Sequence, residues 1–400
     1  MMVTASFRDT AMRDLCELCG ESDLEPLYRP EGTSRGITVH LCAHCGLVQS
    51  LPRADRAERA PAAVSSGADW GNVRYGKGFR TQAAMAALAR HGDLSRALSV
   101  LDVGSNRGSF AKALLETAHE ATLVAIEPDE RVAQSCGSSP RTELIRARIE
   151  DAALESGRFD VVHSCHTIEH LAHPARTLAD HHRVLKDGGL LILDAPNIAI
   201  LASPDIVEEW FIDKHLYHFS ANTLVRMVQR AGFEIVEAPD RADSSNLLLV
   251  ARKSSHHDSG VTDLSEAPRA CALLAHYQAT RSHNLQSLKR IAAELAQLAP
   301  TGLAIWGAGR LFDSLVVHGG FDPRCARLVI DTHLRVHVPE RFGCALAGAD
   351  ELAAADVATV AVMSRDFASE IVREARSRAP HARILIFSEL IARAEPRMAA

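Results

Sequence analysis

Residues 101–110 read Leu-Asp-Val-Gly-Ser-Asn-Arg-Gly-Ser-Phe and join the end of an apolar run to the start of an amphipathic one. The apolar run, residues 97–103, predicts a β-strand, and the stretch that begins at Ser109 predicts a helix. Gly104 and Gly108 lack side chains that would block a ligand, and a helix N-terminus presents free N–H groups. The stretch therefore predicts a glycine turn at which a ligand touches the backbone, although a tight turn with nothing bound is an alternative.

The same alternation of apolar strands and amphipathic helices extends over residues 69–252. It is typical of a mostly parallel sheet that helices cover on both faces. We expect a helix at 222–231 to begin at a Ser220 or Asn222 cap and to end at Gly232. Seven strands are expected, at residues 97–103, 122–127, 143–147, 159–165, 189–195, 233–237 and 246–251, and the other helices at 109–116, 130–136 and 174–184.

Acidic residues follow the next two expected strands. Glu127 ends the second strand, where a doubly wound fold holds the two hydroxyls of a ribose. Glu150 and Asp151 follow the third strand, where they could reach the exocyclic amine of an adenine or simply cap an exposed helix. Residues 104–108 lack the G-x-G-x-x-G pattern of a pyrophosphate site, which disfavours a nicotinamide cofactor.

Two C-x-x-C pairs precede this region, Cys16 with Cys19 and Cys42 with Cys45, and a glycine follows each pair. Four soft thiolates on two tight turns are the ligand set of a closed structural zinc site. Disulfides and a redox motif of the thioredoxin kind are the alternatives. They fit less well, because no apolar signal segment precedes the cysteines and a redox motif would not need duplicating. We therefore expect bound Zn²⁺, with His44 outside the ligand set.

The composition is that of a globular protein, with 400 residues of which 47% are hydrophobic and 24% charged. This length indicates two or three domains. No run approaches the roughly 18 apolar residues of a membrane span. A formal charge of −6 without a long Lys/Arg cluster gives no electrostatic footprint for nucleic acid. We expect a cytoplasmic protein with a small-molecule substrate and with neither nucleic acid nor membrane as partner, in an oligomeric state that the sequence leaves open.

Several stretches occur in a fixed order: residues 102–108, Glu127, residues 160–164, residues 166–171 and residues 185–189. Together they resemble a class I S-adenosylmethionine-dependent methyltransferase, although the usual first motif is richer in glycine. The resemblance implies an α/β Rossmann-like domain in which Glu127 takes the ribose of S-adenosyl-L-methionine. It also implies that the following residues approach the amino-acid part of that cofactor: Asp102, Gly104, Ser105, Asn106 and Gly108.

The end of the fourth expected strand carries further candidates. Cys165 and His166 stand at the edge where open α/β sheets bind ligands, and we expect them to line the cofactor site. Glu169 and His170 follow in the pattern E-H-L-x-x-P. Because this pattern recurs in methyltransferases of different chemistry, the resemblance implies that the pair is architectural rather than catalytic.

The order of parts resembles the three-part C-methyltransferases that modify nucleotide-linked deoxysugars. It predicts a zinc-binding module at residues 1–68, a methyltransferase domain at 69–253 and a smaller Rossmann-like domain at 254–400. In that family a segment after the fifth strand reads E-H-x-x-x-F-S, and residues 213–220 here read Asp-Lys-His-Leu-Tyr-His-Phe-Ser. We expect His215 to be a general base, because methylation of a carbon beside a ketone requires removal of a proton near neutral pH.

Lys214 occupies the position of the family's glutamate. It is either an exposed cation or the holder of an anionic group such as an enolate oxygen. Tyr217 and His218 are candidates for orienting the substrate or carrying a proton. A hydroxyl or amine acceptor could use the same His215. O- or N-methylation of another metabolite therefore stays open, as does a catalytically silent binding protein.

Residues 303–310 repeat the plan of strand, glycine turn and helix. Gly307 and Gly309 could approach a nucleotide phosphate, Asp331 ends the next expected strand where a ribose-binding carboxylate would lie, and Arg310 could contact an anion. The resemblance implies that this domain binds substrate; a scaffold that only supports the central domain is the alternative. We expect a helix at 270–298 and further strands at 328–331, 359–362 and 384–387.

Overall fold

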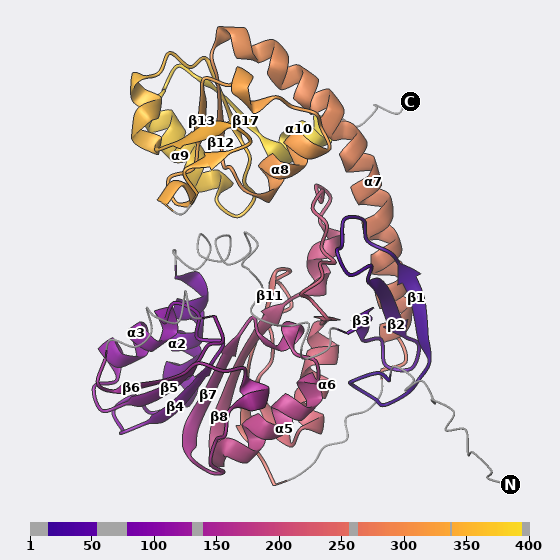
Figure 1. The fold of residues 1–400 in the computed structure, drawn as a ribbon, viewed down its shortest axis with the longest axis vertical. Helices are drawn as coiled ribbons and strands as arrows, with labels where there is room; N and C mark the ends of the chain where they lie inside the picture. Colours follow the sequence, from indigo (N-terminus) through magenta and orange to yellow (C-terminus); the bar gives the residue numbers. More distant parts are fainter. Residues whose placement is uncertain (1–14, 54–77, 130–138, 256–262, 337, 394–400) are drawn as a thin grey trace, which may run out of the picture. The chain divides into compact units, whose positions relative to one another are not determined.

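The computed structural model describes residues 15–53, 78–129, 139–255, 263–336 and 338–393, which fall into two compact units (Figure 1). The first unit contains the described residues of Met1–Glu58, Ala87–Ile198 and Phe211–Ala272. The second contains those of Arg59–Ala86, Ala199–Trp210 and Leu273–Ala400. The helix predicted at 130–136 lies outside the described residues.

A seven-stranded sheet in the order β10-β11-β8-β7-β4-β5-β6 forms the core of the first unit. β4 pairs in parallel with β5 and β7, while β11 runs antiparallel between β8 and β10. All seven predicted strands are confirmed, with shifts of a few residues at their ends. The strands are β4 (Ser99–Val103), β5 (Thr122–Ile126), β6 (Thr142–Ile145), β7 (Phe159–Cys165), β8 (Leu185–Pro196), β10 (Phe233–Glu237) and β11 (Asn246–Lys253).

Helices of the first unit pack on this sheet, with α5 on β8 and α6 on β10 and β11 (Figure 1). Ser220 caps α6: its Oγ accepts from the backbone N–H of Thr223, and the Thr223 Oγ1 accepts from that of Ser220. Of the two caps that the sequence predicted, Ser220 and Asn222, the N-cap of α6 is therefore Ser220. The helices wholly within this unit are α3 (Ser109–Thr117), α5 (Pro174–Val184) and α6 (Ala221–Arg230), with short 3-10 helices η1 (Ile149–Asp151) and η2 (Ile168–His170). The bounds of α2 (Phe79–His91) and η3 (Ile198–Ala202) include residues of both units.

A second sheet in the first unit has four antiparallel strands in the order β1-β2-β3-β9. Its first three strands belong to the cysteine-bearing region: β1 (Leu24–Tyr28), β2 (Thr38–Cys42) and β3 (Val48–Leu51). The fourth strand, β9 (Tyr217–His218), comes from the segment that follows the central sheet's β8 in sequence. A strand of two residues carries no periodic pattern, so the sequence analysis did not predict it.

The second unit contains a six-stranded sheet in the order β14-β15-β13-β12-β16-β17. Its predicted strands are confirmed, but β14 and β15 were missed because they are short and lack a clear apolar pattern. The strands are β12 (Leu303–Trp306), β13 (Leu328–Ile330), β14 (Glu340–Arg341), β15 (Cys344–Ala347), β16 (Thr359–Val362) and β17 (Arg383–Ile386). The helices wholly within this unit are α8 (Arg310–Val317), α9 (Ala368–Arg378) and α10 (Phe387–Arg393), with η4 (Ala299–Thr301), η5 (Pro323–Cys325), η6 (Leu334–Val336) and η7 (Ala349–Ala354). The long helix α7 (Glu266–Leu298) includes residues of both units.

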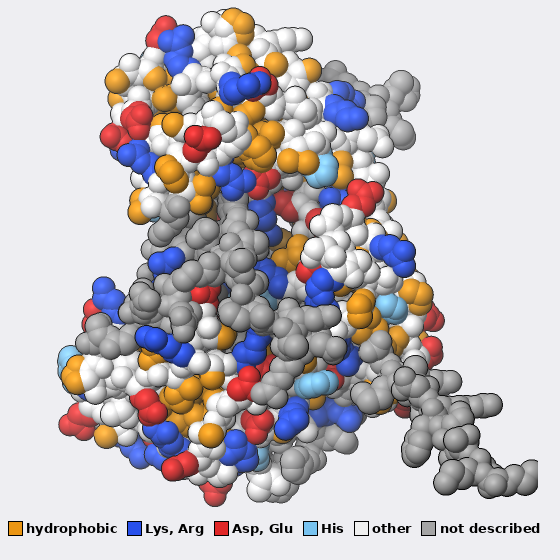
Figure 2. All heavy atoms as spheres, in the orientation of Figure 1, with side chains coloured by type: hydrophobic (Ala, Val, Ile, Leu, Met, Phe, Trp, Pro, Cys, Tyr) orange, Lys and Arg blue, Asp and Glu red, His pale blue; other side chains and the backbone are white. Residues whose placement is uncertain are grey.

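Basic and acidic side chains are interspersed over the face of the molecule drawn in Figure 2. Among the described residues, no helix combines the length and apolar character that crossing a bilayer would require.

Candidate functional site

The carboxyl ends of β4 and β7 meet where the strand order of the central sheet reverses. The chain continues from β4 to β5 and β6 on one side and from β7 to β8 on the other. Open α/β sheets bind ligands at such a point. The Thr167 hydroxyl spans the two strand ends, 3.3 Å from the carbonyl oxygen of Val103 and 3.2 Å from that of Cys165. A Cβ on Gly104 would collide with this hydroxyl, so local packing by itself already requires glycine there.

The predicted strand, glycine turn and helix are confirmed at this edge. Gly104, Asn106 and Gly108 have left-handed φ values of 73°, 48° and 76°. Asparagine tolerates this conformation better than most residues. Gly108 is the N-cap of α3 and provides no side-chain cap, so the first N–H groups of the helix are left to other acceptors. Ser105 is buried within the turn.

Glu127 lies directly beside this turn, at the end of β5. Its carboxylate is buried and accepts hydrogen bonds from the backbone N–H groups of Asn106 at 2.8 Å and Asp129 at 2.9 Å. Burial raises the pKa of the carboxyl group, while the two backbone donors act in the opposite direction. Each carboxylate oxygen has a second lone pair, so Glu127 can accept from ribose hydroxyls as well.

The carboxylate of Asp102 lies in the interior of the domain. It is 1% exposed, and its Oδ1 accepts from the Nδ1 of His163 on β7 at 2.7 Å. The His163 ring in turn stacks on Phe110 of α3, with ring centroids 3.7 Å apart. The side chain of Asp102 is therefore engaged in a buried pair that joins β4 and β7. Glu150 and Asp151, by contrast, are exposed in η1 after β6.

Polar side chains gather after the ends of β7 and β8. The Cys165 Sγ lies 3.6 Å from Asp194 Oδ2, and His166, whose φ is 49°, places its Nε2 3.2 Å from Asn246 Oδ1. A left-handed φ at a non-glycine residue is typical of functional sites. Asp194 and Asn246 were not among the predicted residues. An acid at the end of the apolar β8 was the signal that could have pointed to Asp194.

His215 lies beside His170, for which the E-H-L-x-x-P pattern indicates an architectural role. The ring centroids are 4.9 Å apart, and ligand-type atoms of Glu169, His170 and His215 lie within 4.8 Å of one another. The His170 Nδ1 donates to the carbonyl oxygen of Lys214 at 2.8 Å, and its Nε2 lies 3.5 Å from the buried Glu169 Oε1. The two histidines are 45 positions apart in the numbering, so no spacing rule could have joined them.

Both imidazoles are held in their neutral form. Burial lowers the pKa of His170 to about 4. Burial, with further contributions from His170, His218 and Lys214, lowers the pKa of His215 well below its ordinary value. At pH 7 a neutral imidazole has a lone pair that can accept a proton, but the lowered pKa makes it a weaker base than an ordinary histidine.

The other candidates of the segment differ in burial. Lys214 is exposed. Tyr217 is buried, with its hydroxyl donating to the carbonyl oxygen of Ala172 at 2.8 Å. His218 is also buried, with its Nε2 3.0 Å from the hydroxyl of Ser50.

Comparison with known proteins identifies the reaction class of this region. A family model described as a methyltransferase domain matches residues 76–238. Residues 76–238 therefore match a methyltransferase domain, which supports methyl transfer as the reaction class.

Curated relatives match part of the length of this chain. A Mycobacterium tuberculosis protein named probable S-adenosylmethionine-dependent methyltransferase is 31% identical over 139 residues, 34% of this chain and 49% of that protein. A ubiquinone biosynthesis O-methyltransferase of Thiobacillus denitrificans is 29% identical over 154 residues, 34% of this chain and 65% of that protein. The chain thus spans about half the length of the mycobacterial relative.

A solved structure of the Burkholderia thailandensis 1,6-didemethyltoxoflavin-N1-methyltransferase, with S-adenosylhomocysteine bound, is also similar to this chain. It is 21% identical, covers 58% of this chain and 100% of its own, and has a TM-score of 0.40.

Four cysteines outside the methyltransferase domain lie together. The Sγ atoms of Cys16 and Cys45 are 3.4 Å apart and those of Cys19 and Cys42 3.5 Å, and all four lie within 4.8 Å of one another. Disulfide sulfurs would be about 2.05 Å apart, whereas thiolates around a tetrahedral zinc with bonds of about 2.3 Å lie roughly 3.8 Å apart. The cluster fits a metal shell, and the exposed His44 lies outside it.

The candidate residues of the second unit gather at the carboxyl ends of β12 and β13. Gly307 has a φ of 107°, and a Cβ there would collide with the carbonyl oxygen of Met363. Asp331 accepts from the backbone N–H of Ala308 at 3.0 Å and of Leu334 at 2.9 Å, so its carboxylate braces the turn. Gly309 is the N-cap of α8, and Arg310, the first residue of that helix, is exposed.

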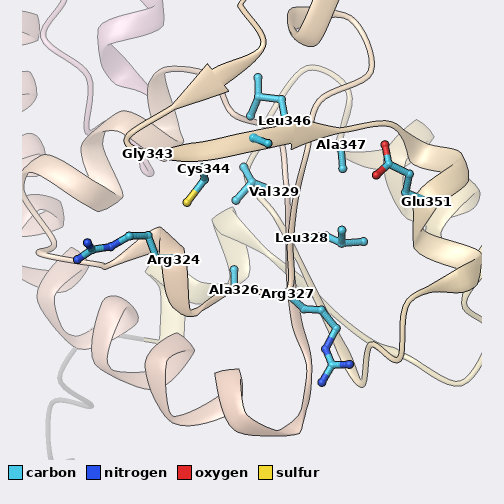
Figure 3. A pocket seen from close by; sticks show the side chains of 11 residues that line it. Arg324, Ala326, Arg327, Leu328, Val329, Gly343, Cys344, Leu346, Ala347 and Glu351 are labelled. Carbon is cyan, nitrogen blue, oxygen red and sulfur yellow. The ribbon is translucent and has the colours of Figure 1, made fainter.

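A pocket of about 380 Å³ in the second unit lies elsewhere, along the start of β13 and beside β15 (Figure 3). Arg324, Arg327 and Glu351 line its sides. None of Gly307, Gly309, Arg310 and Asp331 lines it.

Proposed function

We propose that this chain transfers a methyl group from S-adenosylmethionine to a small biosynthetic metabolite. The methyltransferase domain supports the reaction class, and the turn at Gly104 and Gly108 with Glu127 supports cofactor binding at the switch point of the sheet. When bound, the cofactor supplies an electrophilic methyl group whose bond to sulfur breaks as the bond to the acceptor forms, which leaves S-adenosylhomocysteine. In this proposal Glu127 accepts the ribose hydroxyls, and Glu150 or Asp151 accepts the exocyclic amine of the adenine.

The finer assignment that we favour is C-methylation of a nucleotide-linked ketosugar. The observation that supports a base in this reaction is the imidazole pair, with the ring centroids of His215 and His170 4.9 Å apart. His215 takes the proton from the carbon beside the ketone, and the electron pair of that C–H bond forms the enolate whose carbon receives the methyl group. The hydrogen bond from His170 to the Lys214 carbonyl keeps the neighbouring ring in place.

The side chains around His215 have separate roles in this proposal. The exposed Lys214 faces anionic groups of the substrate, such as the enolate oxygen or a phosphate. Tyr217 and His218 are buried in hydrogen bonds to Ala172 and Ser50, so we assign them to holding the segment rather than to proton transfer.

The second unit is proposed to bind the nucleotide part of the acceptor. Gly307, Gly309 and Arg310 offer a backbone turn and a cation for a phosphate, and Asp331 braces that turn. Zn²⁺ held by the four cysteines is proposed as a structural ion, because four thiolates leave no open coordination position.

The first alternative is O- or N-methylation of another small molecule. Lys214 in place of the family's glutamate favours it, as does the O-methyltransferase named among the relatives. A base at His215 would serve a hydroxyl acceptor equally well. The second alternative, a catalytically silent binding protein, is disfavoured because Gly104, Gly108 and Glu127 are all present.

The test is an incubation of the purified chain with methyl-labelled S-adenosylmethionine and a panel of nucleotide-linked ketosugars. We expect label in one of the sugars, in a product heavier by one methylene unit. Calorimetry with S-adenosylhomocysteine distinguishes the outcomes. Binding without transfer to any sugar would favour the first alternative, whereas no binding would remove the enzyme hypothesis altogether.

A further inference from the structure

The four-cysteine module, defined here as residues 15–53, shares a sheet with the segment that carries His215. β3 of the module pairs antiparallel with β9, so that Val48 lies opposite His218 and Gln49 opposite Tyr217. The pairing continues toward His215, because the Ser50 N–H donates to the carbonyl oxygen of Leu216 at 2.8 Å. The backbone next to the proposed base is therefore part of the module's sheet.

A second set of contacts holds the other side of His215. The carboxylate of Asp213 accepts from the Ser34 N–H at 2.7 Å, the Ser34 hydroxyl at 2.8 Å and the Arg35 N–H at 3.2 Å. The Arg35 guanidinium also donates to the carbonyl oxygen of Asp213 at 3.2 Å. Hydrogen bonds to a carboxylate are stronger than those between neutral groups.

His218 forms the third attachment. Its Nε2 lies 3.0 Å from the Ser50 hydroxyl, and the Phe211 ring packs edge-on against it at 4.6 Å. His215 thus stands between attachments at Asp213 and His218, both of which involve the module.

The cysteines control the geometry of the strand that makes these contacts. Cys42 ends β2, and Cys45 precedes β3 by three positions. The Cys42 N–H donates to the Leu47 carbonyl at 3.0 Å, and the Gly46 N–H donates to the Cys42 carbonyl at 2.9 Å, which forms the knuckle between the strands. A metal bound to these sulfurs fixes this turn, and binding energy at such a site is folding energy for the backbone around it.

We infer that the module is the positioning device for the base: metal binding at the four cysteines orders the backbone that presents His215, with Asp213 and Ser50 as the positioning residues. The consequence for catalysis rests on the proposed function of His215. The coupling between the metal and residues 211–219 does not rest on that function, because it is argued from the contacts between the module and these residues.

Hydrogen exchange with mass spectrometry on the full chain tests this coupling. The measured peptide covers residues 211–219, in the zinc-loaded protein, after chelation and in the Asp213→Asn and Ser50→Ala variants. We expect exchange about tenfold faster or more after chelation and in Asp213→Asn, the factor that corresponds to losing a charge-assisted hydrogen bond worth roughly 1.4 kcal/mol. The exposed Asp187→Asn is the matched control and should exchange like wild type.

Zinc content and binding of S-adenosylhomocysteine are measured on the same samples. Faster exchange at 211–219 in Asp213→Asn, with zinc and cofactor product still bound, supports the coupling. Exchange within twofold of wild type after chelation, or in Asp213→Asn, overturns it. Because neither readout requires methyl transfer, a failed activity assay would count against the proposed function and leave this result intact.

Discussion

The imidazole of His215 lies 4.9 Å from that of His170, centroid to centroid, with the two planes inclined by 50°. The segment of residues 213–218 and the 3-10 helix after β7 meet at this contact, and the hydrogen bond from His170 to the Lys214 carbonyl fixes their relative position. The pair therefore lies between η2, which follows β7 of the central sheet, and β9, which belongs to the sheet of the cysteine module.

Replacement of His215 by glutamine should remove the general base and leave the cofactor site intact. General base catalysis contributes about 10²- to 10⁴-fold, so the rate of methyl transfer should fall by that factor. Affinity for S-adenosylhomocysteine, measured by calorimetry, should stay within threefold of wild type. His119→Gln, an exposed histidine, is the control. A variant at position 215 with wild-type rate would refute the assignment of the base.

Replacement of Glu127 by glutamine should weaken cofactor binding. A hydrogen bond to a charged group contributes roughly 1.5–3 kcal/mol, so we expect an increase of about ten- to a hundredfold in the dissociation constant of S-adenosylhomocysteine. Glu143→Gln, an exposed carboxylate paired with Arg158 at 2.8 Å, serves as the control. Unchanged affinity in Glu127→Gln would mean that the ribose lies elsewhere.

Cys16→Ser should release the metal and destabilise the module, because one soft ligand of four is lost. Metal analysis should find about one zinc per wild-type chain and much less in the variant. His44→Gln should keep its zinc, since His44 lies outside the cluster. Undiminished zinc in Cys16→Ser would show that the four cysteines do not form the site.

The histidines of the site should titrate at acid pH. Burial lowers the folded-state pKa of His215, so the ring stays neutral as the pH falls through 6.5 and gains its proton only below that. As the pH falls, His215 is therefore protonated in the unfolded chain before it is protonated in the folded chain. The stability contributed by this neutral ring is therefore full above pH 6.5 and declines as the pH falls toward the folded-state pKa. Histidine NMR titration measures this directly, and a His215 pKa of 6.5 or higher would contradict it.

Asp331→Ala should destabilise the second unit whether or not a nucleotide binds there. The carboxylate accepts from the N–H groups of Ala308 and Leu334, and its loss should cost roughly 1.5–3 kcal/mol. The buried Trp306 of β12 makes fluorescence a readout of urea unfolding in this unit. The exposed Asp356→Ala should leave the midpoint unchanged. An unchanged midpoint of urea unfolding in Asp331→Ala would show that the carboxylate does not stabilise the turn.

The sequence was sufficient for the elements with strong local signals. The strand of residues 159–165 and the helix of residues 174–184 were predicted with the bounds that the structure has, because apolar runs and caps fix them. The glycine turn was equally clear. The cysteine cluster followed from the spacing of its two pairs.

Relationships between distant segments could not be predicted in this way. β9 has two residues and becomes a strand only because β3 offers it an edge. The contact between His170 and His215 joins two segments that are far apart in the sequence, so no local pattern could predict it. The pairing of Asp102 with the buried His163 depends on how β4 and β7 align, which the sequence does not show.

The most direct test of the central claim is the position of the transferred methyl group. Wild-type chain is incubated with S-adenosylmethionine carrying a ¹³C-labelled methyl group and a nucleotide-linked ketosugar, and the product is examined by carbon NMR. We predict a new methyl group bonded to the carbon beside the ketone. A label bonded to oxygen or nitrogen, or no transfer from a chain that binds S-adenosylhomocysteine, would contradict C-methylation by His215.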